Sequence, residues 1–211
     1  MPGGQVLLVS IIGKRGSGKS EYGIKEYFLT SPSGILLDMG VASESFKYAK
    51  DNRLQISIPK AQTLRDAIFY MKQNKISHFS FHPQSQEEAS FFISQFSKFA
   101  YGKTLMIDDA QKLLSYYDSN SEYKDFLSDG RMMQQNLILC FHKIGEVSTK
   151  TRSESDVIIF MGPLTRRADI EGLYNEWEPQ NMDDMPNMDV LYREMVKTPQ
   201  FRPYFIKGHK S

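Results

Sequence analysis

The 211-residue sequence has one cysteine, no long hydrophobic run and almost no net charge, and each of these absences excludes a class of protein. A single cysteine, Cys140, cannot form a disulfide within the chain, which fits a reducing compartment. The apolar run near the start is far shorter than the roughly 18 residues that a membrane span needs. No basic region precedes it, so we expect a soluble, cytoplasmic protein without direct membrane insertion. The net charge of +1 gives no overall attraction to nucleic acid, so contact with DNA would need a local basic patch or a ring of subunits.

Short apolar runs alternate with segments of helical period along the chain. The apolar runs predict strands at 5–12, 35–38, 54–58, 78–81, 104–108, 136–141 and 157–160. Helices are expected at 19–28, after an N-cap at Thr63, over 84–100 and at 122–133, the last with an interruption near Gly130. The core-facing stripe of the helix over 84–100 is predicted to be Ala89, Phe92, Ile93, Phe96 and Phe99. This order indicates an α/β fold with a mostly parallel sheet flanked by helices on both faces.

Beyond Pro163 the composition and the periodicity of the sequence change. Residues 175–190 are acidic, contain Pro and Met, and show no clean period, which indicates an ordered surface extension or a partly mobile lid. Residues 201–211 alternate and predict a last edge strand. We therefore expect a core over 1–165 and a C-terminal extension over 166–211 that packs on it, in a single domain.

Residues 13–20, GKRGSGKS, match the phosphate-binding pattern G-x-x-x-x-G-K-[ST] at every fixed position. The pattern follows a predicted strand and opens a predicted helix, as a P-loop requires. Lys19 is expected to reach the β- and γ-phosphates, and the Ser20 hydroxyl to bind Mg²⁺. The expected nucleotide-binding residues are Gly13, Lys14, Arg15, Gly16, Ser17, Gly18, Lys19 and Ser20.

A second signal is LMIDD, an apolar strand that ends in two carboxylates. A P-loop enzyme needs an acid on a neighbouring strand to hold Mg²⁺, and Asp108 has that position. Asp109 points elsewhere and is a candidate base for the attacking water. Two solvated aspartates at a strand end are the alternative. The base-reading N-K-x-D of switch-type GTPases is missing, so ATP is the expected nucleotide.

The run NLILCFH predicts a buried strand with His142 at its tip, where a polar residue can sense the γ-phosphate. A histidine that simply satisfies local hydrogen bonds is the alternative. Two arginines lie near such strands, Arg131 and Arg152, and either could stabilise charge on the transferring phosphoryl group, often from a neighbouring subunit. Surface ion pairs are the alternative for both, with Asp125, Asp129 or Glu154.

Taken in order, these motifs resemble the FtsK–HerA superfamily of DNA-translocating ATPases. They are the P-loop, FHP at 81–83, IDDA at 107–110, GRMMQQNLILCFH at 130–142, and a strand after TRSESD at 151–156. The similarity is greatest to the small genome-packaging ATPases of viruses with an internal membrane, and it covers about residues 5–162.

The resemblance implies a role for each matching residue. It places Lys19 and Ser20 at the nucleotide and Mg²⁺, and Asp108 at the metal. Asp109 stands where the family commonly has glutamate, and His142 where it commonly has glutamine. Arg131 matches the proposed trans-acting arginine, with Arg152 as a second candidate.

The resemblance also implies a ring, expected to be a hexamer, with ATP at subunit interfaces and double-stranded DNA in a central channel. Basic stripes would contact DNA phosphates without sequence preference. The candidates are Lys143, Lys150, Arg166 and Arg167. Host cytoplasm or the virion is the implied location, and a capsid or membrane vertex protein is a further implied partner. A small P-loop kinase, with Arg166 and Arg167 leading into a lid, is the main alternative.

Overall fold

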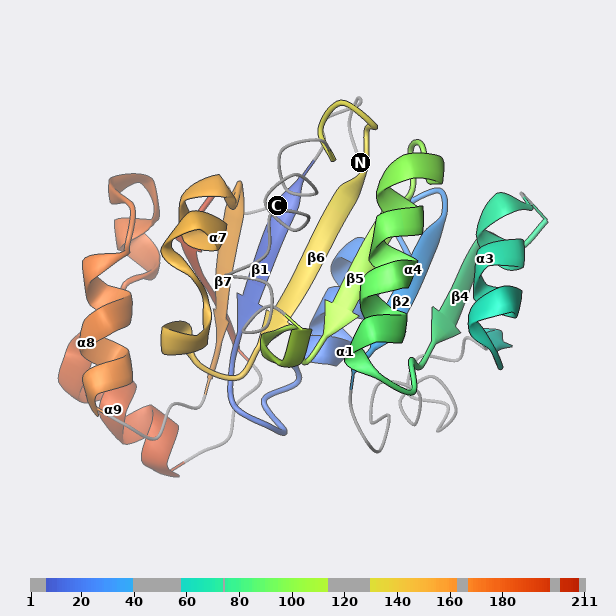
Figure 1. The fold of residues 1–211 in the computed structure, drawn as a ribbon. Helices are drawn as coiled ribbons and strands as arrows, with labels where there is room; N and C mark the ends of the chain where they lie inside the picture. The colour runs from blue at the N-terminus through green and yellow to red at the C-terminus, as the bar shows by residue number, and fades with distance from the viewer. Residues whose placement is uncertain are drawn as a thin grey trace.

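The computed structural model describes residues 7–39, 58–73, 75–113, 130–162, 167–197 and 202–208. Within them, eight strands form one sheet in the order β3-β4-β2-β5-β6-β1-β7-β8 (Figure 1). All neighbouring strands are parallel except the last pair, β7 and β8. In chain order the elements are β1 (Leu8–Ile12), α1 (Lys19–Gly23), η1 (Ile24–Phe28), β2 (Gly34–Asp38), β3 (Lys60–Ala61), α3 (Leu64–Lys72), β4 (His78–Phe81), α4 (Gln86–Phe99), β5 (Thr104–Asp108), β6 (Asn136–Phe141), η2 (Ile144–Glu146), α7 (Thr149–Glu154), β7 (Val157–Met161), α8 (Arg167–Asn175), η3 (Pro179–Asp184), α9 (Met188–Lys197) and β8 (Pro203–Lys207).

Helices cover both faces of this sheet, so the central strands are buried on both sides. On one face, α1 and η1 pack Ile24 and Phe28 against residues such as Ile11 and Met106. On the other face lie α3, α4 and α7, with the larger core (Figure 1). Burial on both sides explains why these strands are continuously apolar rather than alternating. The predicted α/β architecture, a mostly parallel sheet between helices, is confirmed.

Local hydrogen bonds account for where the helices begin. The Thr63 hydroxyl accepts from Asp66 N–H at 3.1 Å while the Asp66 carboxylate accepts from Thr63 N–H at 3.2 Å. This reciprocal pair starts α3 at the predicted N-cap. At the start of α4, the Ser85 hydroxyl accepts from Glu88 N–H at 3.1 Å. After α1 the helix widens into the π-turns of η1, where Leu29 N–H donates to Ile24 C=O at 2.9 Å.

The strands predicted at 35–38, 78–81, 104–108, 136–141 and 157–160 are confirmed within a residue at their ends. The strand predicted at 54–58 lies outside the described residues except for Ile58, which is in no strand. Most of the helix predicted at 122–133 also lies outside them. The predicted interruption near Gly130 agrees with the turn that residues 130–134 form, and residues 131–133 are not helical.

Phe99 was predicted on the buried stripe of α4, and this is wrong. Its side chain is 53% exposed, whereas Phe92 and Phe96 on the same helix are fully buried. Phe99 is the last residue of α4, so its ring projects beyond the core, where the Lys72 ammonium lies 4.7 Å from the ring centroid.

The C-terminal residues form ordered elements that contact the larger core. Residues 175–190 contain η3 and the start of α9, as an ordered surface extension would. Ile170, Leu173, Trp177 and Leu191 join the core cluster, and the Trp177 indole donates to Asn181 C=O at 2.9 Å. The predicted edge strand is β8, antiparallel to β7. The boundary near residue 165 stays a prediction. Among the described helices, not one combines the length and apolar character that crossing a bilayer requires.

Candidate nucleotide site

The candidate site lies at the carboxyl edge of the sheet, meaning the edge where its parallel strands end. The loop from β1 to α1 follows the glycine-rich motif. Gly16 and Gly18 have φ values of 78° and 80°, in the left-handed region that favours glycine. Gly13 N–H donates to Phe141 C=O at 3.0 Å, which ties the loop to the end of β6.

The inside of this loop has the features of an anion cradle. A side chain at Gly13 would meet Ser17 Oγ at 2.5 Å and the Met161 carbonyl oxygen at 2.7 Å, so only glycine allows the loop to pack this closely against the end of β7. Ser17 is fully buried, and its Oγ has no hydrogen-bond partner among the described residues. Lys19 is only 5% exposed. A buried hydroxyl without a partner and a buried cation fit a bound phosphate.

Ser20 connects the cradle to β5. Its hydroxyl donates to Asp108 Oδ1 at 2.8 Å, and Asp108 is 7% exposed. These hard oxygen donors suit Mg²⁺, which is typically held by one or two protein groups together with water and phosphate oxygens. Within the described ranges, no group of three or more His, Cys, Asp or Glu side chains could hold a metal ion.

Asp38, a residue that the sequence analysis did not single out, lies beside Asp108. It ends β2, which pairs with β5 so that the two aspartates are opposite each other. Asp38 is 2% exposed. His82 Nδ1 donates to the Asp38 carbonyl oxygen at 2.9 Å, which ties the end of β4 to the end of β2. ILLD carries the same signal as LMID, an apolar strand that ends in an acid, but the sequence does not reveal that these strands are neighbours.

Asp109 and His142 form a direct pair. His142 Nε2 donates to Asp109 Oδ1 at 2.6 Å, and the Lys112 ammonium lies 3.3 Å from Oδ2. Asp109 has a φ of 54°, rare for a residue with a side chain, which turns its carboxylate away from that of Asp108. Lys112, which the sequence analysis missed, also donates to Met39 C=O at 3.0 Å.

This pairing governs the ionisation of Asp109. The hydrogen bond from His142 holds the pKa of Asp109 well below its usual range, and the charges of His142, Lys112 and Lys19 act in the same direction. Burial opposes them. Asp109 is thus a fixed anion with both oxygens engaged. It can orient a polar group but is a weak proton acceptor.

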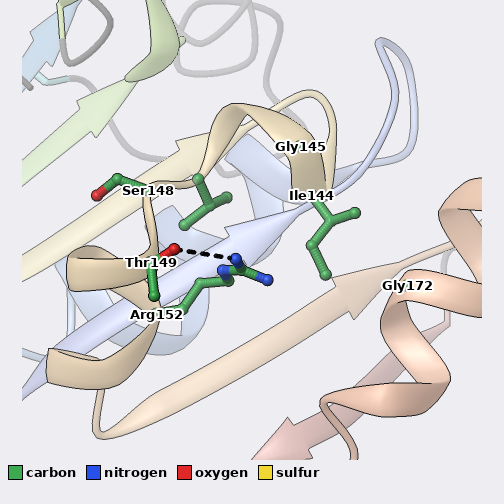
Figure 2. A pocket seen from close by; sticks show the side chains of 7 residues that line it. Ile144, Gly145, Ser148, Thr149, Arg152 and Gly172 are labelled. Carbon is green, nitrogen blue, oxygen red and sulfur yellow. Dashed lines mark hydrogen bonds between the residues drawn. The ribbon is translucent and has the colours of Figure 1, made fainter.

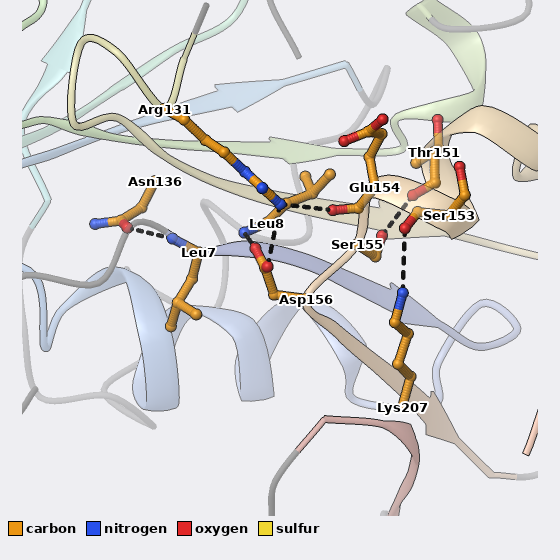
Figure 3. Close-up of polar contacts among 10 residues, drawn as sticks. All are labelled: Leu7, Leu8, Arg131, Asn136, Thr151, Ser153, Glu154, Ser155, Asp156 and Lys207. Atoms are coloured by element: carbon orange, nitrogen blue, oxygen red, sulfur yellow. Dashed lines mark hydrogen bonds and ion pairs between the residues drawn. The ribbon is translucent and has the colours of Figure 1, made fainter. Parts of the chain in front are cut away.

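The two candidate arginines do not join this group. Arg131 precedes β6, so it lies at the amino edge of the sheet, where the parallel strands begin. Its guanidinium is 3.2 Å from Asp156 Oδ1, and Asp156 Oδ2 accepts from Leu8 N–H at 2.8 Å (Figure 3). β1 separates that point from the P-loop by five residues, or about 16 Å at 3.3 Å per residue. Arg131 cannot reach the phosphate site of its own chain.

Arg152 lies on α7, beside a pocket of about 460 Å³ that η2, α7 and α8 line (Figure 2). Its guanidinium pairs with Glu176 at 2.5 Å, and Nη2 donates to Thr149 Oγ1 at 3.4 Å. Ion pairs therefore hold both arginines, Arg131 with Asp156 and Arg152 with Glu176. Of the partners considered from the sequence, Glu154 contacts Arg131 through its carbonyl oxygen at 3.5 Å, and Asp125 and Asp129 lie outside the described residues.

The candidate DNA-contacting residues are only partly described. Lys143 follows β6 at the carboxyl edge, with its side chain 51% exposed and 3.9 Å from Glu146. Lys150 lies on α7 and is partly exposed. Arg166 lies outside the described residues, as does the side chain of Arg167.

Comparison with known proteins shows a similarity of fold. The sequence matches no family model and no curated protein. The fold is that of P-loop NTPases, as the sequence predicts. It is similar to the genome packaging NTPase B204 from Sulfolobus turreted icosahedral virus 2 in complex with ATPγS, with a TM-score of 0.60, 16% identity, and 96% of this chain and 98% of that chain covered.

Two further structures agree with this result. For the sulfate complex of the same NTPase, the TM-score is 0.62 at 17% identity, over 98% of both chains. For B204 described as the DNA-packaging ATPase from Sulfolobus turreted icosahedral virus, it is 0.61 at 16% identity, over 97% of this chain and 98% of that one. At the level of fold, the resemblance drawn from the motifs is confirmed.

Proposed function

We propose that this protein is an ATPase of the genome-packaging type, which hydrolyses ATP with Mg²⁺ in a ring of identical subunits to move double-stranded DNA. The observation that carries the proposal is the set of groups at one edge of the sheet. The cradle at Ser17 and Lys19, the Ser20–Asp108 contact and the Asp109–His142 pair lie at the ends of the neighbouring strands β1, β6 and β5. The full-length similarity of fold to B204 supports it.

Each group has a distinct task in hydrolysis. The amides of the loop and the Lys19 ammonium bind the phosphate oxygens, and Ser20 and Asp108 hold Mg²⁺. The metal, when bound, neutralises charge on the β- and γ-phosphates. Asp109 accepts a hydrogen bond from the attacking water and aligns it with the γ-phosphorus. Because the transition state of phosphoryl transfer is loose, orienting the water matters more than deprotonating it, and its proton can leave with the phosphate product.

His142 and Arg131 complete the proposed site from two sides. His142 keeps Asp109 in place through the 2.6 Å bond and lies at the tip of β6, where it can respond to the γ-phosphate. Since Arg131 is at the opposite edge of the sheet, it can stabilise the transferring phosphoryl group only in a neighbouring subunit. Arg152 remains a second candidate for that role.

Lys143 and Lys150 are the proposed DNA contacts within the described residues. They would bind phosphates in a central channel, without sequence preference and with a steep dependence on salt. We propose that the protein acts in the host cytoplasm or on the virion, where a capsid or membrane vertex protein would receive it.

Steady-state hydrolysis of ATP, with and without double-stranded DNA, tests the proposal. We expect DNA to stimulate turnover by wild type, and Asp109→Asn and Arg131→Ala each to be inactive. Mixing the two variants should restore activity, because about a quarter of the interfaces then combine an intact Asp109 with an intact Arg131 if subunits mix at random. Arg193→Ala, an exposed arginine on α9, is the matched control and should behave as wild type.

A different result would point to other chemistry. Turnover that is indifferent to DNA and to Arg131→Ala would contradict the motor. ATP consumption in step with phosphorylation of a small acceptor would favour the kinase alternative.

A further inference from the structure

Three large apolar side chains are exposed together at the amino edge of the sheet. Phe99, Tyr101 and Met132 are 53%, 60% and 82% exposed, and Met132 is the most exposed large apolar residue of the described ranges. We refer to these three residues as the amino-edge patch. Gly102 N–H donates to Met133 C=O at 3.0 Å, which places the segment with Phe99 and Tyr101 beside the turn that carries Met132. Exposed apolar surface of this kind marks an interaction site more often than isolated residues do.

The turn at residues 130–135 is held rigidly in place. Gln135 N–H donates to Gly130 C=O at 2.8 Å, and the buried Gln135 amide donates to the Phe96 and Ala100 carbonyls at the end of α4, at 3.0 and 3.3 Å. The turn is therefore bonded to the helix that carries Phe99. A surface built in advance loses little conformational entropy when it binds.

Arg131 belongs to the same turn and lies next to Met132 in the sequence. The Arg131 side chain is 55% exposed, and its guanidinium is paired with Asp156 (Figure 3). Both side chains are exposed on this turn, so a partner that binds at Arg131 lies close to Met132. The proposed function gives Arg131 one destination, the nucleotide of another subunit, whose phosphates complement its charge.

We infer that the amino-edge patch docks on the carboxyl edge of a second copy of this chain, next to that copy's P-loop, and so delivers Arg131 to its nucleotide. The inference rests on the proposed function and names the surface that makes the ring. The contact is head-to-tail, because one copy uses its amino edge and the other its carboxyl edge. The patch is the apolar centre of the contact, and the polar groups around it are its rim.

Sedimentation velocity over a range of protein concentrations, with ATPγS and MgCl₂, tests the inference. Met132→Glu and Tyr101→Lys should raise the concentration for half-maximal assembly at least about tenfold, as expected for residues at the centre of an interface. Met182→Glu and Tyr192→Lys are matched controls on η3 and α9, where each native side chain is 46% exposed, and should assemble as wild type. Titration with a fluorescent ATP analogue at low protein concentration should give wild-type affinity for all four variants, which also shows that they fold.

Complementation tests the direction of the contact. Met132→Glu keeps an intact P-loop edge, and Asp109→Asn keeps an intact amino edge. Each should be inactive alone, and their mixture should hydrolyse ATP. Patch variants that assemble like wild type, or a mixture without activity although both variants bind the analogue, would overturn the inference. A wild type that binds and hydrolyses ATP as a monomer would instead contradict the proposed ring, and the inference with it.

Discussion

Replacing Gly13 with alanine tests the cradle directly, because the added methyl group has no room. Its carbon would lie 2.5 Å from Ser17 Oγ, 2.7 Å from the Met161 carbonyl oxygen and 3.0 Å from Met161 Cβ. The serine hydroxyl can rotate away. The Met161 carbonyl belongs to β7, which is paired with a strand on each side, so it cannot move without distorting the sheet. Forcing such a group into a packed site costs about 1–3 kcal/mol.

The free-energy cost of Gly13→Ala can appear as lower stability or as weaker nucleotide binding, and measuring both gives the total cost. If the loop keeps its shape, the protein loses stability, and a chain of this length should melt about 2–12 °C lower. If the loop gives way, the same free energy weakens ATPγS binding, by about 5-fold at the lower limit and 150-fold at the upper. Thermal unfolding with and without ATPγS, together with calorimetric titration, separates the two.

Two other glycines calibrate this experiment. At Gly145 an added Cβ meets no atom within 4 Å, so Gly145→Ala should melt and bind as wild type. At Gly16 there is also space, but φ is +78°, and an alanine there should cost about 1–2 kcal/mol through the backbone alone. A Gly13→Ala protein that melts and binds like wild type would refute the cradle geometry.

Three further predictions concern stability and reactivity. Gln135→Ala removes the side-chain donor to the Phe96 and Ala100 carbonyls, each of which keeps one backbone donor, and should lower the unfolding free energy by about 0.5–1.5 kcal/mol. The exposed neighbour provides the control, since Gln134→Ala should change the unfolding free energy by less than about 0.5 kcal/mol. Equal values in urea unfolding would exclude the capping role. The pKa of Asp109 is depressed by the hydrogen bond from His142, so its contribution to stability is complete above the ordinary carboxyl pKa of about 4 and is lost as the pH falls below it. The free energy of unfolding should therefore fall less steeply with decreasing pH in Asp109→Asn than in wild type. Equal slopes for the two proteins would contradict the pairing of Asp109 with His142. Burial raises the pKa of the Cys140 thiol, so a thiol reagent should label it only on unfolding, and fast labelling of native protein would place Cys140 outside the core.

The parts of the site that could be predicted are those that one short segment encodes. The P-loop is such a segment, since its glycines, lysine and serine are local requirements of one turn. Asp108 and Asp109 were recognisable because an apolar strand ends at them. The structure brings these residues together as predicted, and their roles in catalysis remain predictions for the experiments above.

What could not be predicted depends on the order of strands and on where elements end. Asp38 meets Asp108 only because β2 lies beside β5. Asp156 bonds to Leu8, 148 residues earlier in the chain, and no local pattern indicates such a contact. Phe99 fits the helical period of α4 well, but periodicity does not show that the helix ends at that residue.

The strand order also has a consequence for how the chain folds. β1 is the first strand, yet its two neighbours are β6 and β7, with Leu8 opposite Leu137 and Val9 opposite Val157. The strand that leads into the phosphate-binding loop therefore finds no partner until most of the chain has been made. Contacts so distant in sequence slow the folding of a domain. A newly synthesised chain should become able to bind nucleotide only late, when β7 has joined the sheet, so that binding of ATP would report the completion of folding.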